Sequence, residues 1–323
     1  MRLFSLWVRR AASAALTLFV VSVLIFTASR LMPGGFAEVV LGPFASPEQR
    51  AAVSAEYGLD RGILVQYGLW LEAVAHGDFG TSMISGESVA SELRLRLPVT
   101  AELTLLSVGA AVALGVPLGI WTAVRAGRRG GGALGRLAGG LGVSLPEFVL
   151  GSLVVFVFSR YALGLTVGGY QPLGEDAGAN LRSMVLPAAV LSVFAVAVTA
   201  RTTRDAVLNV LVEPYITASV ARGESPGSII ARHVLRNAAI PVMVAVTTIA
   251  AYLLGGAVII EQLFNLPGVG SYVVQAVQRR DYAVVQAGVL LAAAVFIVIN
   301  MAVDAVAGVL DPRFGTASRK GTA

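Results

Sequence analysis

The stretch "ITASVARGESPGSIIARHVLRNAAIP", residues 216–241, separates two long apolar runs with charged residues, glycine and proline. Upstream and overlapping it, residues 205–221 carry apolar side chains at helical spacing, which predicts a helix. Gly223 suits the left-handed position that commonly follows a helix. Ser225 and Pro226 are typical of the N-cap and the first residue of a second helix. The pattern predicts two helices joined by a tight corner, a rigid shape that favours docking over simple tethering.

The composition of the whole chain is that of a membrane protein. Of 323 residues, 56% are hydrophobic and 13% are charged, whereas a soluble domain carries about 25% charged residues. No cysteine is present, which excludes disulfides, thiolate metal sites and a cysteine nucleophile. The net charge of +5 comes from short clusters at the ends of apolar runs. Membrane lipid is therefore an expected partner and nucleic acid is not.

Six stretches with at most one charge can cross a bilayer as helices, which takes about 20 residues for a core of about 30 Å. They are residues 11–29, 103–124, 137–159, 183–200, 237–260 and 282–303. The expected fold is an all-α integral membrane protein with six transmembrane helices. The apolar run 62–71 is too short to cross, so we expect an interfacial or buried helix outside the bilayer.

The distribution of arginine predicts the orientation of these spans. With the N-terminus taken as cytoplasmic, the inside segments carry 15 cations and four acids, and the outside segments carry nine arginines and 13 acids. The inside sums to +11 and the outside to −4, which favours two cytoplasmic termini. The first span has an uncharged run of 19 residues and no clear cleavage site, so an uncleaved anchor is favoured over a signal peptide.

This orientation predicts a simple division of the chain. A cytoplasmic N-terminus and a first transmembrane helix precede an extracytoplasmic region, and a five-helix core with one cytoplasmic and one extracytoplasmic loop precedes a cytoplasmic tail. In that order the segments are residues 1–10, 11–31, 32–98, 99–306 (with the loops 201–239 and 261–281) and 307–323. The expected location is the cell membrane, crossed several times.

The cytoplasmic loop resembles the EAA coupling loop of binding-protein-dependent ABC transporter permeases. That motif reads E-A-A, three residues, G, nine residues, then I-x-L-P, and the matching residues here are Thr217-Ala218-Ser219, Gly223 and the run from His233 to Arg236. Threonine replaces the glutamate and arginine the final proline, as is typical of the oligopeptide/dipeptide/nickel subfamily. Glu224 departs from that subfamily, which usually has leucine there.

Fragments along most of the chain resemble the same subfamily, in particular the first, B-type permease of the pair. Each fragment is weak evidence, but their order matches the expected topology. They are "GLDRGILVQYGLWL" and "GDFGTS" (58–82), "RLPVTAELTL" (96–105), "SLPEFVLGSL" (144–153), "GGAVIIEQLFNLPGVG" (255–270), "RRDYAVVQ" (279–286) and "INMAVDAVAGVLDPR" (299–313).

The resemblance implies the type I ABC importer permease fold and a transport subunit that is not itself an enzyme. It implies as partners a second homologous permease, two cytoplasmic ATP-binding domains and an extracytoplasmic solute-binding protein. ATP and Mg would bind the partner ATPase subunits, because this chain has no G-x-x-x-x-G-K-[ST] motif and its single lysine is Lys320. No catalytic residue, metal site or cofactor is expected. The residues implied in ATPase coupling are Thr217, Ala218, Ser219, Gly223, Ser225, His233 and Arg236.

Among substrates, the resemblance favours oligopeptides or dipeptides, with nickel, glutathione or another small solute as alternatives. Two other classes of membrane protein compete. An ion-coupled secondary transporter would carry intramembrane charges and often internal repeats, and only Glu147 and Asp304 are candidate acids within spans. A membrane enzyme would need a Ser/His, His/Glu or paired-Asp constellation at membrane depth, and the sequence contains no visible one.

The extracytoplasmic loop that starts at residue 261 is the predicted outer gate. Its prolines and glycines favour a compact turn, and its many large apolar side chains favour a position over the pore mouth. The candidate gate residues are Glu261, Phe264, Pro267, Gly268, Gly270 and Val273. The alternative is an ordinary connector that faces solvent.

Three further residues have two interpretations each. Glu147 faces either a polar seam between helices or the substrate path. Asp304 either pairs with polar groups near the inner end of the last span or lines the path. His233 is expected to be a hydrogen-bonding member of the corner rather than a ligand, because it has no partner set for a metal.

Overall fold

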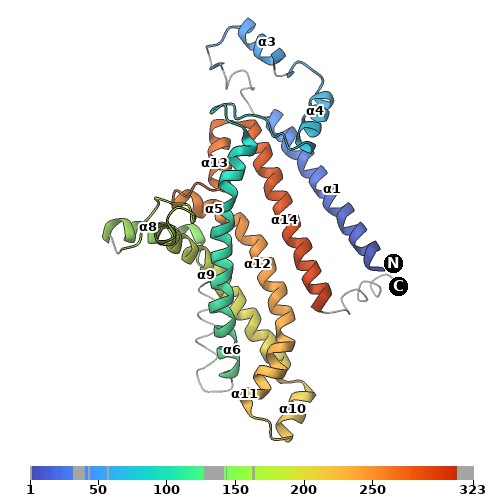
Figure 1. The fold of residues 1–323 in the computed structure, drawn as a ribbon, viewed down its shortest axis with the longest axis vertical. Helices are drawn as coiled ribbons and strands as arrows, with labels where there is room; N and C mark the ends of the chain where they lie inside the picture. The colour runs from blue at the N-terminus through green and yellow to red at the C-terminus, as the bar shows by residue number, and fades with distance from the viewer. Residues whose placement is uncertain are drawn as a thin grey trace. The chain divides into compact units, whose positions relative to one another are not determined.

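The computed structural model describes residues 2–31, 41–42, 44–56, 58–126, 142, 144–161 and 164–310, which form helices and their connections with no strand among them. Figure 1 shows the order of the helices along the chain. They are α1 (Arg2–Leu31), α3 (Pro47–Glu56), α4 (Ile63–Ala75), α5 (Val89–Ala110), the π-helical η1 (Ala111–Gly115), α6 (Val116–Val124), α8 (Glu147–Tyr161), α9 (Ala177–Leu211), α10 (Pro214–Ala221), α11 (Pro226–Ile229), the π-helical η2 (Ile230–Val234), α12 (Leu235–Leu263), α13 (Val269–Arg279) and α14 (Tyr282–Leu310).

Five continuous helices in the described part of the chain are long and apolar enough to cross a membrane. They are Val8–Leu31, Val89–Val124, Ala177–Leu211, Pro226–Leu263 and Tyr282–Val303. The prediction of six spans is thus one more than the number found in the described residues. The stretch predicted as the remaining span, 137–159, contributes α8, whose 15 residues extend about 22 Å at about 1.5 Å per residue, short of a core of about 30 Å. Residues 137–141 and 143 lie outside the described residues.

The chain divides into two compact units. One comprises the described parts of Met1–Val99 and Pro267–Ile297, and the other those of Thr100–Leu266 and Val298–Ala323. The core of the first unit is formed by buried residues of the first turns of α5, of α13 and of the first half of α14. These are Val89, Leu93, Val269, Ala276, Val284, Val285 and Ala287.

In the second unit, α9 packs closely against η1 and α6 because two glycines leave room for it. A Cβ on Gly115 would lie 2.8 Å from Cβ of Thr199, and one on Gly119 would lie 2.5 Å from Cβ of Thr203. Small residues at such spacing let helix backbones approach in membranes, where packing and not water exclusion drives association. This contact fixes α9, whose C-terminal end leads into the corner predicted from the sequence.

Candidate functional site: a helical corner and the α13 segment

The α10–α11 corner, residues 212–234, begins where α9 ends. The sequence predicted one helix over 205–221, but α9 ends at Leu211 and a separate helix, α10, starts at Pro214. The break follows from Glu213, which precedes a proline and is extended, with φ −70° and ψ 142°. A proline disfavours the helical conformation of the residue before it and is itself well suited to the first position of a helix.

The turn between α10 and α11 has the geometry predicted from its residues. Gly223 has φ +80°, and a Cβ on it would meet no atom within 4 Å. The positive φ angle, and not a lack of space for a side chain, therefore favours glycine at position 223. Ser225 is the N-cap of α11, where its Oγ accepts a hydrogen bond from Ser228 N at 3.4 Å, and Pro226 is the first helical residue. These three predictions are confirmed.

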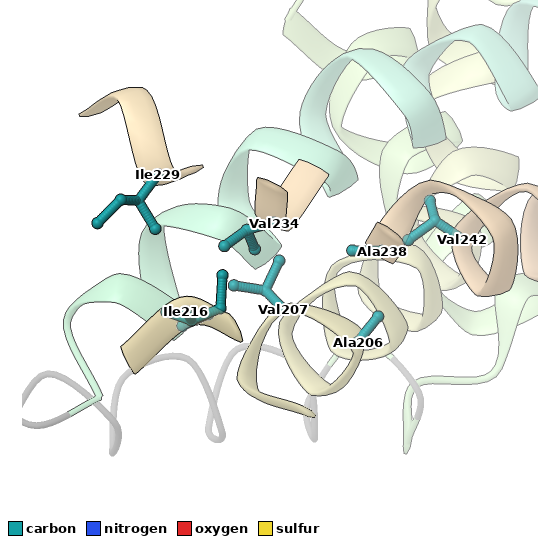
Figure 2. Close-up of a cluster of buried hydrophobic side chains, with 8 residues drawn as sticks. Ala206, Val207, Ile216, Ile229, Val234, Ala238 and Val242 are labelled. Atoms are coloured by element: carbon teal, nitrogen blue, oxygen red, sulfur yellow. The ribbon is translucent and has the colours of Figure 1, made fainter. Parts of the chain in front are cut away.

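A buried apolar cluster holds the corner together. Figure 2 shows Ile216 of α10, Ile229 of α11 and Val234 of η2 converging with Val207 of α9. Val207 and Val234 are fully buried, and Ala238 of α12 continues the cluster. Burying each valine or isoleucine stabilises the fold by about 1.5–3 kcal/mol relative to exposure. The corner is therefore a rigid extension of α9 and α12 and not a flexible loop.

Polar side chains form a clamp across the turn. The Arg222 guanidinium donates from Nη2 to Ser219 Oγ at 2.8 Å and to Glu224 Oε1 at 2.9 Å. His233 Nε2 lies 3.1 Å from Glu224 Oε2. The hydrogen bonds from Arg222 and then from His233 lower the pKa of Glu224, because both stabilise its ionised form. The clamp joins the end of α10 to η2.

The predicted coupling residues divide into exposed and inward-facing groups. Thr217, Ala218, Gly223, Ser225 and Arg236 are exposed or partly exposed. Ser219 is 1% exposed and forms part of the clamp, while His233 is half-buried beside Glu224. Sequence reasoning placed Ser219 with Ala218 in a partner contact, and its burial assigns it to the interior instead. The clamp was not predicted from the sequence. The one indication of it was Glu224, which stands where the subfamily usually has leucine.

The second candidate element, the α13 segment (residues 264–281), is mostly helical, because α13 occupies Val269–Arg279. Gly268 is the N-cap of α13, Gly270 is buried in its first turn, and Pro267 is exposed just before it. Val273 packs so closely against Gly288 of α14 that any Cβ at position 288 would clash with it. The segment therefore differs from a connector that faces solvent on all sides.

The end of the α13 segment is fixed by contacts within the same unit. Arg280 closes α13 in the left-handed conformation, with φ 58°. Asp281 is 3% exposed, and its Oδ2 accepts a hydrogen bond of 2.5 Å from Ser82 Oγ. These residues are 199 positions apart, so no local pattern could have indicated their pairing.

The residues at the start of the predicted gate are more deeply buried than expected. Glu261 belongs to α12, which continues to Leu263, and is fully buried. Its Oε1 accepts a hydrogen bond of 2.6 Å from Thr100 Oγ1. Phe264 is also fully buried. Glu261 therefore lies within the last turn of α12 and not in the connection that follows it.

Glu147 lies in the first turn of α8. Its carboxylate faces α12, where a Cβ on Gly256 would lie 2.7 Å from Glu147 Oε2. The structure thus places the Glu147 carboxylate beside Gly256 of α12. The side chain of Asp304 lies outside the described residues. Among the residues that are described, no group of three or more His, Cys, Asp or Glu side chains could hold a metal ion.

Comparisons with known proteins agree with these observations. Residues 115–316 match the model of the family described as "Binding-protein-dependent transport system inner membrane component", and residues 3–104 match the N-terminal model of such membrane components. A probable peptide ABC transporter permease of Sinorhizobium fredii is 34% identical over 94% of this chain and 97% of its own length. A putative peptide transport permease of Brucella abortus is 36% identical, with coverages of 96% and 98%.

Two further similarities concern another transport system and the fold. The glutathione transport system permease GsiC of Salmonella typhimurium is 37% identical over 92% of this chain and 94% of its own. Among solved structures, the MetNI methionine ABC transporter in an inward-facing conformation matches 68% of this chain and 96% of that chain. The TM-score is 0.50 and the sequence identity 20%.

Proposed function

Because the chain belongs to the family of binding-protein-dependent transport system inner membrane components, we propose that it forms half of a path for imported peptides. The chain is a multi-pass membrane permease subunit of an ABC importer. A second homologous permease would supply the other half of the path. An extracytoplasmic solute-binding protein would deliver the peptide, and two ATP-binding subunits would hold ATP and Mg.

The main support for this proposal is the α10–α11 corner, which would contact an ATPase subunit. Its exposed surface presents the small residues Thr217 and Ala218, which allow close approach of another protein. Its core includes Val207 of α9 and Ala238 of α12. A displacement of the corner would therefore move both long helices together, which is how ATPase closure would reach the path.

The charge distribution supports a cytoplasmic position of the corner. The inside segments sum to +11 and the outside segments to −4 when both termini are cytoplasmic. With this orientation the α13 segment would lie on the extracytoplasmic side, where the binding protein would dock. We assign the outer gate to the α13 segment, because its apolar face packs against α5 and α14 and its short helix is a separate element.

The substrate assignment rests on the relatives named as peptide permeases. Glutathione is the second candidate, because a glutathione permease is similarly close in sequence. The partner binding protein decides between them: calorimetry with short peptides of several lengths, glutathione and nickel should show tight binding of peptides. Tight binding of glutathione or nickel alone would overturn the peptide assignment and leave the permease assignment in place.

The docking role is tested by cross-linking in the assembled importer. The chain has no native cysteine, so an Ala218→Cys variant carries a single reactive thiol. A short thiol cross-linker should join it to an ATPase subunit that carries a cysteine in its facing cleft. Ser219→Cys is the matched control, because position 219 is 1% exposed and should not react. An importer that transports normally while position 218 labels freely and never cross-links would contradict the docking role.

A further inference from the structure

The helix α4 is too short to cross a membrane but has an apolar surface that nothing in its own unit covers. Its 13 residues extend about 20 Å, and none of them is buried. Glu72 is its one charged residue. The most exposed apolar side chains are Ile63 (53%), Leu64 (83%), Val65 (53%) and Leu69 (47%). At about 100° per residue, Leu64, Val65 and Leu69 lie on the side of α4 away from Trp70, and Glu72 lies on that same side nearer the end of the helix. Exposed apolar side chains gathered in this way mark an interaction surface.

Contacts with α1 place α4 beside a membrane span and not beyond its end. Tyr67 Oη lies 2.7 Å from Ser22 Oγ, and the Tyr67 ring packs edge-on against Phe19 and Phe26. Trp70 also contacts Phe26, with ring centroids 5.5 Å apart. The span of α1 ends at Leu31, so at about 1.5 Å per residue Ser22 lies about 14 Å inside that end. The side chain of Tyr67 thus reaches deep into the level of the span.

The hydroxyl groups at this contact are paired within the protein, as hydrocarbon requires. The hydroxyls of Ser22 and Tyr67 pair with each other, and Ser22 Oγ also donates to Phe19 O at 2.7 Å. At the entrance to α4, Gln66 Nε2 donates to Leu59 O at 3.1 Å and to Arg61 O at 2.7 Å. These bonds give the backbone carbonyls of Leu59 and Arg61 a hydrogen-bond donor that water would otherwise supply.

We propose that α4 lies within the membrane, in the leaflet at the Leu31 end of α1, and that its exposed side chains Ile63, Leu64, Val65 and Leu69 contact lipid acyl chains. The span α1 exposes apolar side chains as well, for example Leu24, which is 63% exposed. Charged residues flank α4 at Asp60 and Arg61 and again beyond its end at Asp78, which suits an element that returns to the headgroups on both sides. The proposal replaces the expectation of a helix outside the bilayer and does not depend on the transported solute.

The test uses nitroxide spin labels on the full chain in phosphatidylcholine vesicles. The absence of native cysteine allows single variants Leu64→Cys and Leu69→Cys, with Leu24→Cys as the lipid reference and Ala52→Cys on α3 as the water reference. Labels at 64 and 69 should collide often with oxygen and rarely with a water-soluble nickel chelate, as at position 24. Frequent collision with the chelate, as at position 52, would overturn the proposal.

A third outcome, rare collision with both reagents, would also overturn it, because protein would then cover the face. A second pair of variants gives an independent measurement. Leu64→Lys should lower the amount of chain inserted in the membrane, since a charge is costly in hydrocarbon, whereas Ala52→Lys should not. Normal insertion and normal thermal stability of Leu64→Lys would contradict a lipid contact.

Discussion

The α10–α11 corner and the α13 segment are both short helical elements between long membrane helices. They differ in the residue that takes the left-handed conformation at the end of the helix. At the corner, the left-handed residue after α10 is Gly223, with φ +80° and open space around it. In the α13 segment, the left-handed residue that ends the helix is Arg280, with φ 58°. An L-residue with a side chain pays about 1–2 kcal/mol for that conformation.

The difference shows how each element keeps its shape. The turn of the corner depends on local rules, namely a glycine, an N-cap serine and a proline, beside an apolar cluster that the corner shares with α9 and α12. The α13 segment depends on packing against distant residues, such as Val273 on Gly288 and Asp281 on Ser82. These contacts hold Arg280 in a costly conformation. Changes at the corner should therefore alter function first, and changes around α13 should alter stability first.

The largest expected effect is that of Gly223→Val. A β-branched residue is strained at positive φ, so the turn between α10 and α11 should open and the docking surface should lose its shape. Peptide uptake and substrate-stimulated ATP hydrolysis by the assembled importer should be abolished, while the chain still inserts in the membrane. Both activities are measured in proteoliposomes.

The matched control is Gly227→Val in α11. A Cβ on Gly227 would also meet no atom within 4 Å, but this glycine lacks a positive φ, so its variant should keep uptake. Equal uptake by the two variants, at the wild-type rate, would remove the distinction between a corner set by one dihedral angle and an ordinary loop.

A smaller effect, on stability, is expected for Gly288→Ala. The added methyl group would clash with Val273, and overpacking of this kind costs about 1–3 kcal/mol. The variant should unfold at a lower temperature in detergent, as followed by tryptophan fluorescence. The double variant Gly288→Ala/Val273→Ala should recover part of the loss, because it restores space.

Gly68→Ala in α4 is the control for the second prediction, since a Cβ there meets no atom within 4 Å. If Gly288→Ala and Gly68→Ala unfold at the same temperature as the unchanged chain, α13 is not held by its contact with α14, and the contrast between the two elements disappears.

The smallest expected effect is a gain in the stability of the folded chain. Arg280→Gly removes the cost of the left-handed conformation and should stabilise the chain by about 1 kcal/mol, after the greater flexibility of glycine in the unfolded chain is subtracted. Arg279→Gly, one residue earlier and still helical, should destabilise it by about 0.5–1 kcal/mol. The two variants are compared by thermal unfolding. A loss of stability in both would show that the Arg280 side chain matters more than its backbone angle.

Sequence reasoning was accurate where a rule acts over a few residues. Gly223, Ser225 and Pro226 could be assigned because turn and cap preferences are local. The helix break before Pro214 follows from the same kind of local rule. It was not predicted, because the apolar residues of 205–221 keep a helical spacing across the break. Within the predicted span 137–159, the described helix α8 begins only at Glu147, and hydropathy could not indicate this start because it measures composition and not where a helix begins.

The sequence by itself determined that this chain is a helical membrane protein, which family it resembles and where a rigid corner interrupts its apolar runs. Only the tertiary structure decided which side chains face inward: Ser219 in the clamp, Glu261 against Thr100, Asp281 against Ser82, and Tyr67 against Ser22. The physical reason is distance along the chain. Backbone preferences and hydropathy act within a turn or a span, whereas a buried polar group is stable only beside a partner that the fold brings from elsewhere.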